Sequence, residues 1–148
     1  MSKGRLEAFS DGVFAIIITI MVLELRPPHE AAFEALRPLA PSLFAYFFSF
    51  LVLGIYWNNH HHLMQVTQHV DGRVLWANLS LLFWLSLFPF ATAWVGDTNF
   101  GGAPIATYGI VCLGAGFGYY VLVRALLRLH AADSKLAAAI GNDLNRPW

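Results

Sequence analysis

The sequence predicts an all-α fold, a polytopic membrane helix bundle with four transmembrane helices and a cytoplasmic N-terminus. Hydrophobic residues make up 57% of the 148 residues and charged residues only 12%, against roughly 45–50% and about 25% in soluble domains. The hydrophobic residues lie in long uncharged blocks. Most positive charges lie before the first block, between the second and third blocks, and near or beyond the end of the last block. The formal net charge is 0, so we expect no nucleic-acid partner. The single cysteine, Cys112, excludes a disulfide framework within the chain.

Three uncharged blocks are each long enough to cross a bilayer core of about 30 Å, which takes about 20 helical residues. The first block is shorter and reaches that length only if Asp11 or Glu24 is included. A secretory signal peptide has a similar pattern, but Asp11 interrupts the apolar run and residues 25–28 lack a small-residue cleavage site. We therefore favour a retained first helix. The predicted helices cover residues 6–25, 40–64, 73–96 and 103–130.

Proline marks the first connection and the middle of the third helix. Because proline ends a helix or occupies its first turn, four prolines delimit the first connection: Pro27, Pro28, Pro38 and Pro41. Pro89 lies inside the third helix and is expected to kink it, with neighbouring groups satisfying the freed carbonyl. We interpret residues 1–132 as one transmembrane domain and residues 133–148 as a polar tail of the kind that leads back into a membrane.

The distribution of positive charge predicts the orientation in the membrane. Of the 9 Lys and Arg residues, only Arg26 and Arg37 fall on the side opposite the N-terminus. Loops that carry an excess of Lys and Arg remain in the cytoplasm. The N-terminus is therefore predicted to be cytoplasmic in a multi-pass membrane protein.

The first helix has two distinct faces on a helical wheel of about 100° per residue. Relative to Ile16, Leu23 lies within roughly 20°, Ile20 within roughly 40° and Thr19 within roughly 60°, whereas Asp11 lies about 140° away. The stripe of Ile16, Thr19, Ile20 and Leu23 fits lipid contact or helix packing. A buried carboxylate is costly in hydrocarbon unless it has partners, so Asp11 is expected to accept hydrogen bonds. Candidate donors lie near the same depth: Asn58, Asn59, His60, His61 and Asn78.

The histidines at 60–62, with His69 beyond, raise the question of a metal or haem site. Consecutive helical residues project about 100° apart, whereas zinc ligands on a helix are spaced i, i+3 or i, i+4. We therefore expect no metal and interpret these histidines as part of a polar or interfacial network. The pair Gly114 and Gly118 predicts close helix packing. The sequence contains no nucleophile–base pair, phosphate-binding glycine loop or catalytic carboxylate pair, so we expect no enzyme.

Residues 5–11 read Arg-Leu-Glu-Ala-Phe-Ser-Asp, and the pattern Arg-x-x-x-Phe-Ser-Asp resembles the hallmark of the transmembrane protein 175 family, the lysosomal potassium channels and their bacterial relatives. Residues 12–16, Gly-Val-Phe-Ala-Ile, are similar to the bacterial form of the motif. Residues 57–61, Asn78 and the pair 89–90 resemble the signatures of the second and third helices. The resemblance covers essentially the whole chain.

The resemblance implies a cation channel of modest potassium selectivity, a homotetramer in the plasma or inner cell membrane with a pore lined by the first helix. Ile16 would form a hydrophobic gate, Ile20 and Leu23 further apolar layers, and Thr19 would influence ion choice. A helix-locking motif would hold the pore helix in place: Arg5, Phe9, Ser10 and Asp11. Its partners would be Trp57, Asn59, His60, His61 and Asn78. The resemblance implies lipid and permeant potassium ions as partners and no cofactor.

Two other functions stay open. The first is an ion- or proton-coupled small transporter in which Asp11 or Glu24 titrates. The second is a non-conducting membrane protein with a haem or metal site at His60 or His61. Members of the family typically have six helices, so we expect the fifth and sixth to be missing from this sequence or absent in nature.

Overall fold

The computed structural model describes residues 2–132, and all of its regular elements in that range are helices. The predicted all-α fold is therefore confirmed. The helices are α1 Lys3–Leu23, the 3₁₀ helix η1 Phe33–Leu39, α2 Ala40–Val66, α3 Gly72–Ser86, α4 Phe88–Asp97 and α5 Gly102–Ala132. The predicted polar tail lies outside the described residues.

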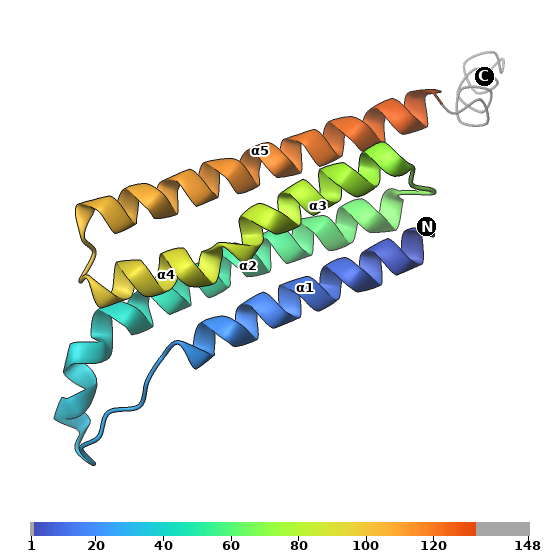
Figure 1. Cartoon of the computed structure of the whole chain (residues 1–148). Coiled ribbons are helices and arrows are strands. Elements are labelled where there is room, and N and C mark those ends of the chain that lie inside the picture. The colour runs from blue at the N-terminus through green and yellow to red at the C-terminus, as the bar shows by residue number, and fades with distance from the viewer. Residues whose placement is uncertain (1, 133–148) are drawn as a thin grey trace, which may run out of the picture.

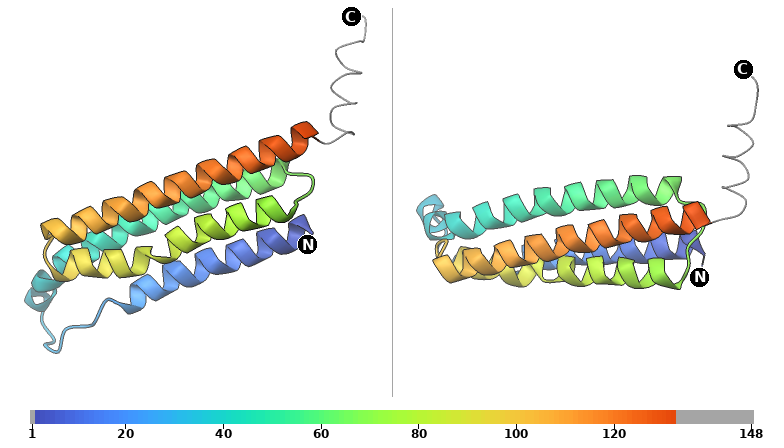
Figure 2. Two further views of the ribbon diagram at one scale, coloured as in Figure 1. Left: turned by 45° about the horizontal axis from the view of Figure 1, so that its top comes forward. Right: turned by 90° about the horizontal axis from the view of Figure 1, so that it is seen from above.

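The helices form an elongated antiparallel bundle (Figures 1 and 2). The start of α1, the α2–α3 connection and the end of α5 lie at one end, which we call the N-terminal end, whereas η1 and the α4–α5 turn lie at the other, which we call the η1 end. Four helical stretches are long and apolar enough to cross a membrane: Lys3–Leu23, Phe33–Val66, Gly72–Asp97 and Gly102–Ala131. The four predicted membrane helices are therefore confirmed, and their observed bounds differ from the predicted ones by a few residues.

Local sequence explains where the helices begin. The Ser2 hydroxyl accepts the Arg5 backbone N–H at 3.3 Å, and the Asp71 carboxylate accepts the Val74 N–H at 2.9 Å. Such side-chain caps satisfy N–H groups that have no partner within the first helical turn. Pro41 lies in the first turn of α2, where its missing N–H costs nothing.

The third span is broken in its middle. α3 ends at Ser86, and α4 begins at Phe88 with Pro89 in its first turn. Proline cannot donate the hydrogen bond that would continue the helix, and its ring clashes with the preceding turn. The predicted distortion at Pro89 is thus confirmed, and it takes the form of two consecutive helices within one span.

Glycine brings α5 close to α3. A Cβ atom built on Gly114 would collide with the Trp84 ring, and one on Gly118 would lie 2.9 Å from Leu81 Cα. Small residues permit this approach, which supplies much of the packing energy in lipid. The predicted packing role of the two glycines is therefore confirmed. A similar contact that the sequence did not indicate joins α4 to α2, where a Cβ on Gly96 would lie 2.7 Å from Ser42 Cα.

Candidate functional site

Three buried polar residues on three helices form one hydrogen-bonded chain, which we call the Ser10 chain: His60, Asn78 and Ser10. His60 Nε2–H on α2 donates to Asn78 Oδ1 on α3 at 2.7 Å, and the Asn78 amide donates to Ser10 Oγ on α1 at 2.9 Å. The Ser10 hydroxyl donates to the Leu6 carbonyl at 2.8 Å. All three side chains are 0% exposed. The chain therefore fixes α1, α2 and α3 against one another at one depth.

The hydrogen bond to Asn78 and the packing of the ring fix how His60 lies in this chain. Because Asn78 Oδ1 only accepts, the proton in that hydrogen bond lies on Nε2. Nδ1 is buried and has no hydrogen-bond partner among residues 2–132. The ring also packs against Phe14 of α1, with the ring centroids 5.8 Å apart. His60 therefore contacts α1 in two ways, through the hydrogen-bonded chain to Ser10 and through its ring against Phe14.

A second contact joins α1 to α2 nearer the surface. Trp57 Nε1–H donates to Asp11 Oδ1 at 3.1 Å, and the Trp57 ring stacks on His61 with centroids 5.6 Å apart at 17°. His61 Nδ1 lies 3.5 Å from Glu7 Oε1. Asp11 thus turns toward α2, away from the Ile16 stripe.

The face of α1 that carries the Ile16 stripe is largely exposed within residues 2–132. The buried residues of α1 lie on its other side: Leu6, Ser10, Phe14, Ile17 and Met21. Ile16 is 58% exposed and Leu23 is 78% exposed, and Ile20 and Thr19 are exposed as well. The structure therefore places the four stripe residues together on one largely exposed surface of α1.

Three residues of the expected network lie outside it. Arg5, Phe9 and Asn59 are exposed, and their side chains make no hydrogen bond or ion pair with another residue in the described range. Arg5 contributes only its backbone N–H, which Ser2 caps. Within residues 2–132, no three His, Cys, Asp or Glu side chains gather closely enough to hold a metal ion.

Comparison with known proteins decides the family. The family described as endosomal/lysosomal potassium channel TMEM175 matches residues 5–89. A protein of Chryseobacterium sp. named as a potassium channel is 55% identical over 140 residues, which cover 95% of this chain and 73% of that protein. The chain belongs to the TMEM175 family.

Other members of the TMEM175 family are similar over nearly the same length. A protein of Streptomyces collinus named as a potassium channel is 34% identical, covering 92% of this chain and 70% of its own. The crystal structure of a lysosomal potassium-selective channel TMEM175 homolog from Chamaesiphon minutus matches with a TM-score of 0.71 at 28% identity, covering 95% of this chain and 78% of its own. The resemblance to this family that the sequence motifs indicate is thus confirmed.

The TMEM175 match includes the whole Ser10 chain and the α1 stripe but ends before α5 begins. A second hydrogen-bonded chain, which we call the Ser49 chain, lies partly beyond that limit and links half-buried Tyr108 to buried Ser49 and Thr92. Ser49 Oγ on α2 lies 2.7 Å from Thr92 Oγ1 on α4 and 2.8 Å from the Tyr108 hydroxyl on α5.

The Ser49 chain also reaches α1, because the Thr92 hydroxyl lies 3.9 Å from Met21 Sδ, a weak acceptor. Each of the three hydroxyls can donate or accept in the two shorter contacts. Sequence reasoning missed this chain. Its only sequence signal is the presence of Ser, Thr and Tyr hydroxyls inside apolar blocks. That signal is weak, because many Ser and Thr hydroxyls donate to a backbone carbonyl of their own helix instead.

Proposed function

We propose that this TMEM175-family protein is a potassium-selective cation channel whose pore is lined by the exposed face of α1. Relatives at 55% and 34% identity are named as potassium channels. The observation that carries the proposal is the division of α1 into a buried face fixed by the Ser10 chain and an exposed face that includes Ile16. Because its buried face is fixed, such a helix presents the same side chains to an axis that it shares with other subunits.

Ile16 is proposed as the hydrophobic gate and Thr19 as the residue that influences ion choice. A ring of isoleucine side chains excludes water from a narrow neck, and an ion does not pass until the neck widens. The Thr19 hydroxyl lies 2.9 Å from the Ala15 carbonyl and 3.0 Å from the Ile16 carbonyl. Because its proton is used within the helix, the oxygen offers lone pairs to a passing cation. Ile20 and Leu23 would add further apolar layers toward the η1 end.

Assembly as a homotetramer in the plasma or inner cell membrane is part of the proposal. A groove of about 700 Å³ lies between α1 and the α3–α4 region, and Pro89, Phe90 and Trp94 form the apolar wall on its α4 side. Apolar side chains of this kind can receive a helix of the neighbouring subunit. Among described residues, only Arg26 and Arg37 carry positive charge at the η1 end, which supports a cytoplasmic N-terminus. The only ions required are the permeant potassium ions, with no cofactor.

The test is ion flux through purified protein in planar bilayers, with one isoleucine changed at a time. Ile16→Asn is expected to raise conductance and to lower the potassium-to-sodium permeability ratio, because the neck becomes wettable. Ile55→Asn is the matched control, because Ile55 on α2 is 61% exposed and Ile16 is 58% exposed. Equal currents for the wild type and both variants would show that Ile16 does not line the narrow neck of the pore. Saturable uptake without single-channel steps would favour a transporter instead.

A further inference from the structure

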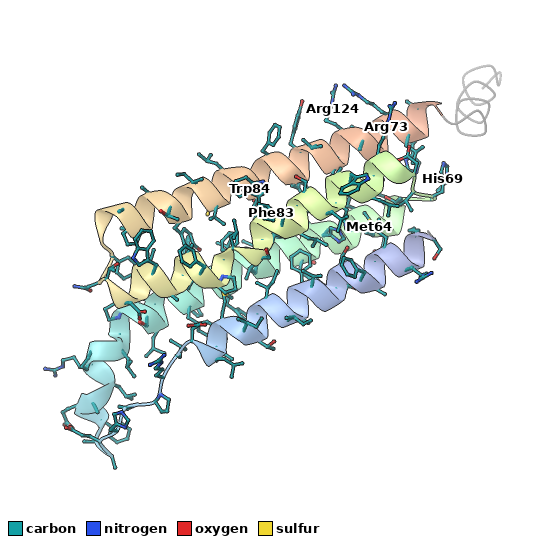
Figure 3. The ribbon with its side chains drawn as sticks, viewed as in Figure 1. Met64, His69, Arg73, Phe83, Trp84 and Arg124 are labelled. Atoms are coloured by element: carbon teal, nitrogen blue, oxygen red, sulfur yellow. The ribbon has the colours of Figure 1, made fainter. Side chains whose placement is uncertain are left out.

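A groove of about 970 Å³ opens on the outside of α3 and α5 at the N-terminal end of the bundle. Its walls carry Arg73 from the first turn of α3 and Arg124 and Arg128 from the last third of α5. Figure 3 shows Arg73 and Arg124 on the same side of these two helices. The groove therefore gathers arginines from two helices that are distant in sequence.

The positive charge in this groove is not neutralised within residues 2–132. None of the three arginines makes a hydrogen bond or ion pair with another residue of that range. The lining contains one carboxylate, Asp71, and that group caps α3 by accepting the Val74 N–H at 2.9 Å. Three guanidinium groups and one carboxylate leave a formal charge of 3 − 1 = +2. Unpaired guanidinium groups beside hydrocarbon favour an anionic ligand.

An apolar track leads from the groove toward the middle of the membrane. Tyr120, Phe117 and Leu113 of α5 are 57%, 65% and 77% exposed. On the helical wheel each lies within about 40° of Arg124, so the four residues form one stripe. Trp76 on α3 also lines the groove and is 75% exposed, as is typical of interfacial tryptophan.

We propose that this groove binds an anionic phospholipid, with the headgroup phosphate on the arginines and an acyl chain along the Tyr120–Leu113 stripe. Guanidinium groups match phosphate oxygens in pairs, and basic pockets between transmembrane helices bind anionic headgroups. Arg128 and Arg124 lie about 6 Å and about 12 Å from the end of α5, within reach of the headgroup layer by extension of their side chains. A water-soluble anion would fit the charge but leave the apolar track uncovered. The inference requires insertion in a membrane and does not rest on ion conduction.

Lipid retention tests the charge requirement. Protein purified from vesicles of equimolar phosphatidylglycerol and phosphatidylcholine is examined by native mass spectrometry. The measured quantity is the ratio of retained phosphatidylglycerol to retained phosphatidylcholine. Arg73→Gln, Arg124→Gln and Arg128→Gln are each expected to lower this ratio about fivefold. Arg26→Gln, at the η1 end, is the matched control and leaves the ratio unchanged. Variants that match the control would overturn the proposal, as would displacement of phosphatidylglycerol by millimolar inorganic phosphate.

Fluorescence tests the location without altering the arginines. Brominated phosphatidylglycerol is expected to quench tryptophan emission of the wild type more than brominated phosphatidylcholine does, and Trp76→Phe is expected to abolish that difference. If neither lipid quenches Trp76, another protein surface covers the groove and the proposal fails. Equal quenching by both lipids would show contact with bulk lipid and would also refute it.

Discussion

Replacing Asn78 by alanine tests whether the Ser10 chain holds α1 in place. The change leaves His60 Nε2–H buried without an acceptor and removes the hydrogen bond to Ser10. An orphaned buried donor costs about 1–3 kcal/mol, and an interhelical hydrogen bond in a membrane protein averages about 0.6 kcal/mol. We therefore expect Asn78→Ala to lower the unfolding free energy by about 2–4 kcal/mol.

The measurement is helix loss by circular dichroism as dodecyl sulfate is titrated into mixed micelles. Asn59→Ala is the matched control, because Asn59 is exposed and has no hydrogen bond with another residue of the described range. The double variant Asn78→Ala/His60→Leu should lose less stability than the sum of the two single variants, because it removes donor and acceptor together. Strict additivity, or an Asn78→Ala curve that overlies the Asn59→Ala curve, would refute the role assigned to the chain.

Three further predictions concern other contacts of the bundle. Gly114→Val should destabilise the protein by about 1–3 kcal/mol through collision with Trp84, whereas Gly109→Val, which meets open space, should leave the thermal unfolding temperature unchanged. Ser49→Ala should cost about 1 kcal/mol in the same detergent titration, since two interhelical hydrogen bonds are lost, and no cost would contradict a structural role. Asp11→Ala should reduce the fraction of the proposed tetramer in light scattering without altering ion preference, whereas an intact tetramer with altered selectivity would show that the two faces of α1 are reversed.

The membrane helices and the faces of α1 could be predicted because hydrophobicity and helical period determine both. The 140° separation of Asp11 from Ile16 follows from about 100° per residue alone, and the structure places Asp11 against Trp57 while Ile16 remains exposed. The break at Pro89 was equally predictable, because it depends on a missing N–H rather than on tertiary contacts.

The Ser49 chain and the basic groove could not be predicted, because each depends on which helices become neighbours. A serine or threonine in an apolar block can bond its own backbone, as Thr19 does, or another helix, as Ser49 does. The arginines at 73 and 124 are far apart in sequence, and the close approach of α3 and α5 brings them to one groove. Only the Gly114–Gly118 pair hinted at that approach, and it does not identify the partner helix.

The two polar chains contact α1 with unequal strength, and this difference predicts where the helix would pivot if it tilts. Ser10 is fixed by a full-strength hydrogen bond at 2.9 Å, whereas Met21 receives only a weak hydroxyl contact to sulfur at 3.9 Å. A tilt that keeps the stronger bond pivots near Ser10. At 1.5 Å per residue, a tilt of about 5° displaces Ile16 by about 0.8 Å and Leu23 by about 1.7 Å. The end of α1 at the η1 end of the bundle would therefore move about twice as far as Ile16, with the pivot near the N-terminus of the helix.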